Sequence, residues 1–176
     1  GTAYNEWSTQ GKPLVFLHGI TGSSNSWDAI APSFVDDYRV MAFDLRGHGQ
    51  SGKPDSGYGW ETDYARDIST FITEQLDEPA IVVGHSLGAT VSAPVAVQAG
   101  EAVRAIVMED PPSFAHENQD DVRSRFAATL AARRMPVDLR TGALMGRTGM
   151  DRAAARSRAE RLRGMSERVL IELTEG

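Results

Sequence analysis

A serine enclosed by two glycines is the feature that most constrains how this chain folds. Residues 81–90 read I-V-V-G-H-S-L-G-A-T, so an apolar run of strand length leads into Ser86 and small residues suited to a helix follow it. A strand that turns directly into a helix needs unusual backbone angles at the serine, and Gly84 and Gly88 remove side chains that would collide there. The pattern predicts that Ser86 projects from this turn as a nucleophile. The alternative is a glycine–serine turn without chemistry.

Short apolar runs recur through the first 110 residues and predict a sheet. Each run is apolar on both faces, as in strands of a parallel sheet that helices cover on either side. Helical patterns fill the intervals, and this strand–helix–strand repetition indicates a doubly wound α/β fold with a parallel-type sheet. Residues 2–7 fit a further strand at an edge. The four runs are Leu14–Leu17, Val40–Phe43, Ile81–Val83 and Ala105–Met108.

Helices are expected in three of the intervals. Residues 64–76 carry an apolar stripe at helical spacing, which predicts an amphipathic helix. Residues 86–98 are small and apolar, as in a helix packed closely on a sheet, and Pro94 predicts a local kink there. Either Ser24 or Asn25 is expected to cap a short helix that runs to about Phe34.

The pattern changes after Pro111 and Pro112, beyond which no convincing strand run occurs. We therefore divide the chain into a sheet-containing core over 1–112 and a helical lid or cap segment over 113–176, which we interpret as a lobe and not as a second independent domain. Three helices are expected in the lobe: one marked by Val122, Phe126 and Leu130 that Pro136 ends, an arginine-rich one from Asp151 to Gly164, and one capped by Ser166.

Composition excludes several classes of chemistry. The 176 residues contain no cysteine, so a disulfide, a thiolate nucleophile and a zinc–cysteine site are impossible. The net charge of −6 argues against nucleic acid as a partner. Arginine supplies 16 of the 18 cationic side chains, and those between Arg123 and Arg168 are interpreted as solvated helix faces. We expect no cofactor, no metal and no membrane span, and the lack of a visible signal peptide favours the cytoplasm.

Several motifs together resemble the α/β-hydrolase family of the serine esterase type. Besides the Ser86 turn they are L-V-F-L-H-G at 14–19, G-S-S-N-S-W at 22–27, D-L-R-G-H-G-Q-S at 44–51 and M-E-D-P-P at 108–112. The resemblance implies that the backbone N–H groups of Ile20 and Leu87 form an oxyanion hole beside Ser86. It also implies a chain incomplete at both ends, because the family's first strand and last two strands have no counterpart here.

The family's catalytic histidine follows the lid, and nothing in this chain corresponds to it. Of the four histidines, His18, His48 and His85 are interpreted as structural, and His116 at the start of the lobe is the least implausible substitute. We therefore expect the base to come from outside this chain. Two further sets of candidates remain. Asp110 or Glu109 is a candidate acid, unless Asp110 only braces the Pro111-Pro112 turn. Trp27 and Phe114 are candidates to line a pocket, unless they only join the lid to the core.

These motifs predict a serine hydrolase that acts on carboxylic esters or related acyl compounds through an acyl-enzyme on Ser86. One alternative is a receptor-like relative that binds a ligand without turnover. Another is a fragment that functions only when a complementary chain, or a second copy, supplies the remaining strands. An unpaired last strand would leave apolar surface bare, so the isolated chain is expected to aggregate or dimerise.

Overall fold

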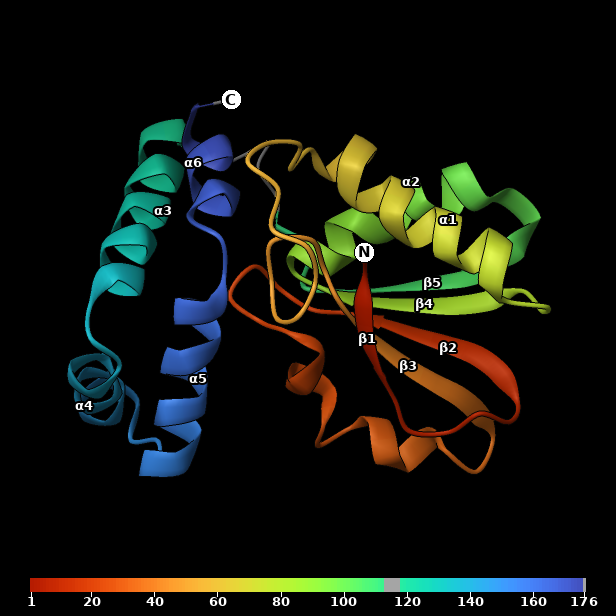
Figure 1. Ribbon diagram of the computed structural model, residues 1–176, viewed down its shortest axis with the longest axis horizontal. Coiled ribbons are helices and arrows are strands. Elements are labelled where there is room, and N and C mark those ends of the chain that lie inside the picture. The colour runs from red at the N-terminus through yellow and green to blue at the C-terminus, as the bar shows by residue number, and fades with distance from the viewer. Residues whose placement is uncertain (113–117, 176) are drawn as a thin grey trace. The chain divides into compact units, whose positions relative to one another are not determined.

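The apolar runs pair into one five-stranded sheet (Figure 1). The first strand lies at an edge and runs antiparallel to its neighbour, and the other pairs are parallel. All four predicted runs and the predicted edge strand are therefore confirmed. In spatial order the strands are β1 (Ala3–Glu6), β3 (Tyr38–Asp44), β2 (Lys12–Leu17), β4 (Ala80–His85) and β5 (Val103–Glu109).

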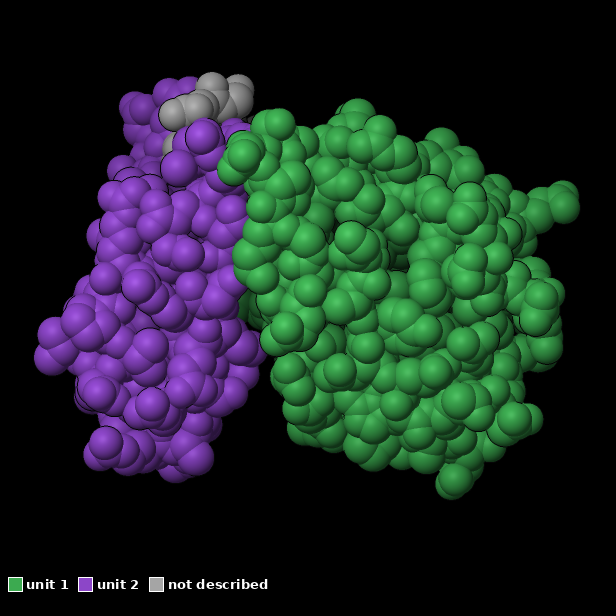
Figure 2. All heavy atoms as spheres, viewed as in Figure 1, with its two compact units in different colours: residues 1–112 green, residues 113–176 purple. Residues whose placement is uncertain are grey.

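The chain divides into two compact units, residues 1–112 and 113–176, which Figure 2 colours separately. The computed structural model describes residues 1–112 and 118–175. The first unit contains the sheet, and the described part of the second consists of helices and their connections. No helix in the described ranges is both long and apolar enough to cross a bilayer.

Both faces of the central strands are buried. On one face lie α1 (Ala65–Gln75), which follows a π-helical turn at Trp60–Tyr64, and α2 (Leu87–Ala99), which contains Pro94 (Figure 1). Phe43 meets Phe71 of α1 there, with ring centroids 4.7 Å apart. On the other face Trp27 packs on Phe16 at 4.6 Å, within a cluster that includes Leu14. The alternating β pattern therefore buries the strands against two separate layers.

Strand β5 differs from the other parallel strands because it is exposed. Val107 and Met108 retain 51% and 40% of their accessible surface, and among the described residues β5 pairs only with β4. The expectation that helices cover this run on both faces is therefore wrong, whereas the expected bare apolar edge is present.

The segment after β2 forms two 3₁₀ turns, Ser24–Trp27 and Ala31–Phe34, where one capped helix was expected. Ser23, in an extended conformation, is the N-cap in place of Ser24 or Asn25. The segment is divided at Pro32, which has no N–H to donate to a carbonyl one turn earlier and therefore disfavours one continuous helix.

The second unit has four helices in its described part, one more than expected: α3 (Gln119–Arg134), α4 (Val137–Thr148), α5 (Arg152–Gly164) and α6 (Glu167–Glu175). Asp151 caps α5 as expected, since its Oδ1 accepts from Ala154 N at 2.9 Å. Arg133 joins α3 to α6 through a 2.6 Å ion pair with Glu167. Helix α4 escaped prediction because Gly142 and Gly146 interrupt its pattern.

Candidate active site

Ser86 occupies the turn between β4 and α2 with φ 51° and ψ −113°, a region that non-glycine residues rarely adopt. Its N–H donates to the carbonyl oxygen of Glu109 at 2.9 Å. The flanking glycines are sterically required. A Cβ on Gly84 would lie 2.2 Å from Gly88 O, and one on Gly88 would lie 2.1 Å from Leu17 O. The backbone around Ser86 is thus fixed by close approach of main chain to main chain.

The loop after β2 lies against this turn. A Cβ on Gly19 would be 3.3 Å from Ser86 Cβ and 2.9 Å from His85 Nδ1. Gly88 N donates to His18 O at 3.1 Å, so that N–H is already used. Within the described ranges the N–H groups of Ile20 and Leu87 donate to no other group of the chain. The two N–H groups expected to form the oxyanion hole therefore have no acceptor among those residues. Leu87 begins α2 directly after Ser86, and Ile20 follows Gly19 in the loop after β2.

Two histidines brace the loop after β2. His18 is fully buried, and its Nε2 accepts from Leu45 N at 3.0 Å, which leaves Nδ1 to donate to Gly19 O at 2.8 Å. His48 is also fully buried, with Nε2 2.8 Å from Ile20 O and Nδ1 2.9 Å from Arg46 O. Burial lowers the pKa of His48. Both rings hold backbone carbonyls near the candidate oxyanion hole, as their structural interpretation requires.

The remaining candidates fall at the ends of neighbouring strands. His85 is half-buried beside Gly19. Glu109 ends β5 opposite His85, and the next residue, Asp110, has φ 47°. The side chains of Glu109 and Asp110 are exposed at the carboxyl-terminal ends of the strands, where Ser86 also lies. His116 and Phe114 lie outside the described residues.

Trp27 belongs to the hydrophobic core. It is 5% exposed and stacks on Phe16 in the cluster beneath the first 3₁₀ turn. This position gives Trp27 a packing role and leaves its predicted place in a substrate pocket without support.

Asp44, at the start of the 44–51 motif, is a buried carboxylate that ends β3, and sequence reasoning assigned it no role. Its Oδ1 accepts from Ser24 N and its Oδ2 from Gln50 N, each at 2.7 Å, so it joins the loops after β2 and β3. Burial alone would raise the pKa of Asp44, but the hydrogen bonds from Gln50 and Ser24 lower it below its usual range. The one indication in the sequence was the glycine at position 49, because any side chain there would collide with Asp44. A Cβ on Gly49 would lie 2.0 Å from Asp44 Oδ2. The described residues contain no group of three or more acidic or histidine side chains arranged to hold a metal ion.

A serine with φ 51° at the turn from a parallel strand into a helix, within a largely parallel sheet, is typical of the α/β-hydrolase class of protein. Residues 12–155 match the model of the alpha/beta hydrolase fold family, and the chain belongs to this family. It is similar to 2-(acetamidomethylene)succinate hydrolase of Mesorhizobium japonicum, with 38% identity over 67% of this chain and 42% of that protein. It is also similar to a non-heme chloroperoxidase of Streptomyces lividans, with 34% identity over 81% of this chain and 56% of the relative.

The solved structures agree with this membership. A crystal structure of E-2-(acetamidomethylene)succinate hydrolase superposes with a TM-score of 0.81 and 29% identity, over 98% of this chain and 68% of that one. The chain spans about half the length of the curated relatives described above, 42% and 56% of them.

Proposed function

We propose that the protein is a serine hydrolase of carboxylic esters or related acyl compounds, with Ser86 as the nucleophile. The observation that carries the proposal is the Ser86 turn itself, held at φ 51° by the required glycines on either side. A strained residue that the surrounding backbone over-determines is typical of a functional site. The relatives named as hydrolases support the same reaction class.

The mechanism follows from the groups around the serine. Ser86 Oγ attacks the substrate carbonyl carbon while a base takes its proton, and the N–H groups of Ile20 and Leu87 stabilise the resulting oxyanion. The N-terminus of α2 adds the positive end of the helix dipole. The tetrahedral intermediate releases the alcohol, which receives the proton from the base, and leaves an acyl group on Ser86. Water, deprotonated by the same base, then releases the acid and restores the serine.

The base, in this proposal, is a histidine from outside residues 1–176. Both nitrogens of His18 and of His48 already face backbone groups, so neither ring is free to take the serine proton. Glu109 or Asp110 would orient the incoming histidine, because Glu109 ends the strand next to the Ser86 turn and Asp110 follows it. The exposed edge of β5 is where further strands would pair, whether from a longer form of this chain, a complementary chain or a second copy.

Both buried histidines face backbone groups and are not available as the base. This also favours a second candidate, a binding protein on a hydrolase scaffold. Such a protein would use the site without turnover. Saturable ligand binding without product would identify it, whereas product formation that depends on Ser86 would exclude it.

The test is intact-mass spectrometry after treatment with a fluorophosphonate, which reacts with an activated serine. The same sample is assayed with p-nitrophenyl acetate and with 2-(acetamidomethylene)succinate. The sample must also contain the segment that is proposed to supply the histidine. On such a sample we expect one adduct, which is absent in Ser86→Ala. If such a sample turns over substrate equally well after Ser86→Ala, the nucleophile assignment is wrong. If the complete sample neither labels nor turns over, the binding protein becomes the better assignment.

A further inference from the structure

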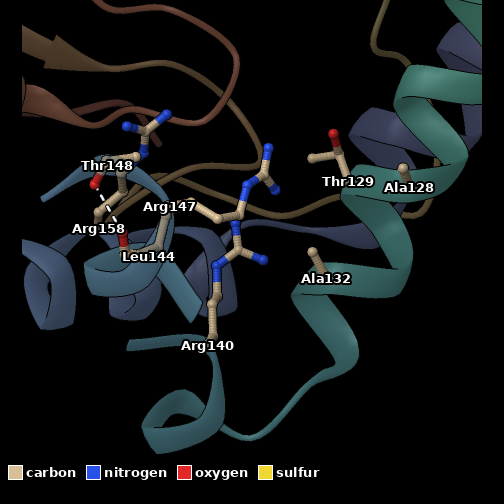
Figure 3. Close-up of a pocket in the computed structure, with 8 residues that line it drawn as sticks. All are labelled: Ala128, Thr129, Ala132, Arg140, Leu144, Arg147, Thr148 and Arg158. Carbon is tan, nitrogen blue, oxygen red and sulfur yellow. Dashed lines mark hydrogen bonds between the residues drawn. The ribbon is translucent and has the colours of Figure 1, made fainter. Parts of the chain in front are cut away.

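The second unit contains a cavity that the proposed hydrolysis does not use. It has a volume of about 250 Å³ and lies between α3, α4 and α5 (Figure 3). Its wall includes Arg140 and Arg147 from α4 and Arg158 from α5, together with two threonines and three apolar side chains. All of these residues belong to one compact unit, so the cavity does not depend on how the two units are placed.

The charge in this cavity is uncompensated. No acidic side chain is among the lining residues, and none of the three arginines forms an ion pair within the described ranges. The nearby acids are engaged elsewhere, since Asp138 pairs with Arg156 at 2.8 Å and Glu160 pairs with the same arginine at 2.9 Å. Three like charges therefore line one small space, with Arg140 half-buried and Arg147 and Arg158 exposed.

Arg140 is the most unusual of the three. Its Nε and Nη1 atoms are buried without a hydrogen-bond partner. Burial, and then the charge of Arg158, lowers the pKa of its guanidinium. Arg133 on α3 shows how the same unit satisfies a half-buried arginine, because its Nε donates to Met165 O and its Nη1 to Glu167 Oε1, each at 2.6 Å. A buried cation without such partners is costly unless a ligand supplies them.

We propose that this cavity, the Arg140 pocket, binds a small organic or inorganic dianion, with its oxyanion group held by Arg140 and its charge balanced by Arg147 and Arg158. A guanidinium presents a planar fork of N–H donors that matches a carboxylate or a phosphate. The two unpartnered atoms, Nε and Nη1, lie on different edges of that fork, each beside Nη2. A bound oxyanion therefore satisfies one of them together with Nη2, as Asp67 does with Nε and Nη2 of Arg46. In Figure 3 the Arg140 side chain extends from α4 into the space beside Ala132.

Two sources of the same chemistry are to be distinguished, a short dicarboxylate and free phosphate. The Leu144 and Ala132 side chains offer apolar contact to the carbon chain of a dicarboxylate, which phosphate lacks. Isothermal titration calorimetry of the 176-residue chain at low ionic strength with succinate, with inorganic phosphate and with neutral succinamide separates them. Saturable binding of succinate or of phosphate, with none of succinamide, supports the pocket and identifies the source. No saturable binding of either anion overturns it.

Substitutions locate the binding. We expect Arg140→Gln to weaken the affinity for the anion at least tenfold. The variant should melt at a temperature no lower than the parent chain, because the substitution removes a charge that no acidic side chain balances. Arg158→Gln is the second variant and carries the test if Arg140→Gln does not fold. Arg152→Gln removes an exposed charge from the same helix as Arg158 and is expected to change affinity less than twofold. Equal losses of affinity in the Arg152 and Arg158 variants would mean that the anion is held only by general charge attraction, which would overturn the proposal.

A Ser86→Ala chain is expected to bind the anion as tightly as the parent. This control separates the Arg140 pocket from the proposed hydrolysis, since failure at either site leaves the other measurable.

Discussion

The N–H of Gly88 donates to the carbonyl oxygen of His18 over 3.1 Å, and this bond joins the helix after the candidate nucleophile to the loop after β2. The contact exists only because Gly88 has no side chain, since a Cβ would lie 2.1 Å from Leu17 O. The spacing between the two candidate oxyanion donors, Ile20 and Leu87, is therefore set by backbone packing.

Gly88→Ala is expected to destabilise the fold by about 3 kcal/mol or more, because the new methyl group must displace the β2 backbone. Urea denaturation followed by circular dichroism measures the change. Gly142→Ala in α4 is the matched control, since a Cβ there meets nothing within 4 Å. It should stabilise the chain by about 0.5–1 kcal/mol through helix propensity. Equal stability of the two variants would mean that the backbone contact at Gly88 is not constraining.

Ser86→Gly and Ser86→Ala are expected to separate strain from chemistry. Both remove the hydroxyl and should abolish fluorophosphonate labelling. Only glycine accepts φ 51° without a steric cost, so Ser86→Gly should be more stable than Ser86→Ala by about 1 kcal/mol. Thermal melts of the two variants provide the measurement. A Ser86→Ala chain at least as stable as Ser86→Gly would contradict the strain.

Asp44→Asn is expected to change how stability depends on acid. The pKa of Asp44 is lowered in the folded state. Its contribution to the free energy of unfolding is therefore present above the pKa of the unfolded chain, about 4, and is lost as the pH falls through the folded-state pKa. The variant should lose about 1–3 kcal/mol at pH 7, because an amide replaces one of two acceptor oxygens. Its stability should also fall less steeply between about pH 5 and pH 3 than that of the parent. An unchanged slope would show that Asp44 does not carry this acid dependence.

His48→Gln is expected to remove a different part of the pH dependence. Burial lowers the folded-state pKa of His48, despite the nearby charge of Asp44, so the stability it supports is present above about pH 6.5 and declines as the pH falls through the folded value. Melting temperatures measured between pH 7.5 and 5 should fall for the parent and remain flatter for the variant. If both curves decline in parallel, another group titrates there.

Val107→Lys is expected to reduce self-association of the isolated chain. Val107 is 51% exposed on β5, and a lysine on an open sheet edge opposes pairing with a second chain. Val97→Lys is the control, because Val97 is 83% exposed but belongs to helix α2 and not to the strand that would pair. Size-exclusion chromatography with light scattering distinguishes them. A parent chain that is already monomeric at high concentration would remove the basis for the prediction.

Local constraints explain which features could be predicted from the sequence. Strand length, apolarity and paired glycines predicted β2 to β5 and the Ser86 turn, because each constraint acts within about ten residues. Asp44 was missed because the N–H of Ser24 reaches its carboxylate from 20 positions away in the chain. The arginines of the second unit were interpreted as solvated, and most of them are exposed, Arg147 and Arg158 included. No single helix pattern shows that Arg140 of α4 and Arg158 of α5 line one cavity.

The bond from Ser86 N to Glu109 O places residue 86 in the hydrogen-bond ladder of the sheet, next to the last paired residues of β4 and β5. Within the described ranges no hydrogen bond uses the Ser86 hydroxyl, so the main chain holds the turn and the side chain is independent of it. The side chain proposed as the nucleophile can therefore be exchanged without the loss of a hydrogen bond. Cysteine or aspartate at position 86 should occupy the same place above the sheet. The proposed nucleophile could therefore be changed while the backbone of the turn stays unaltered.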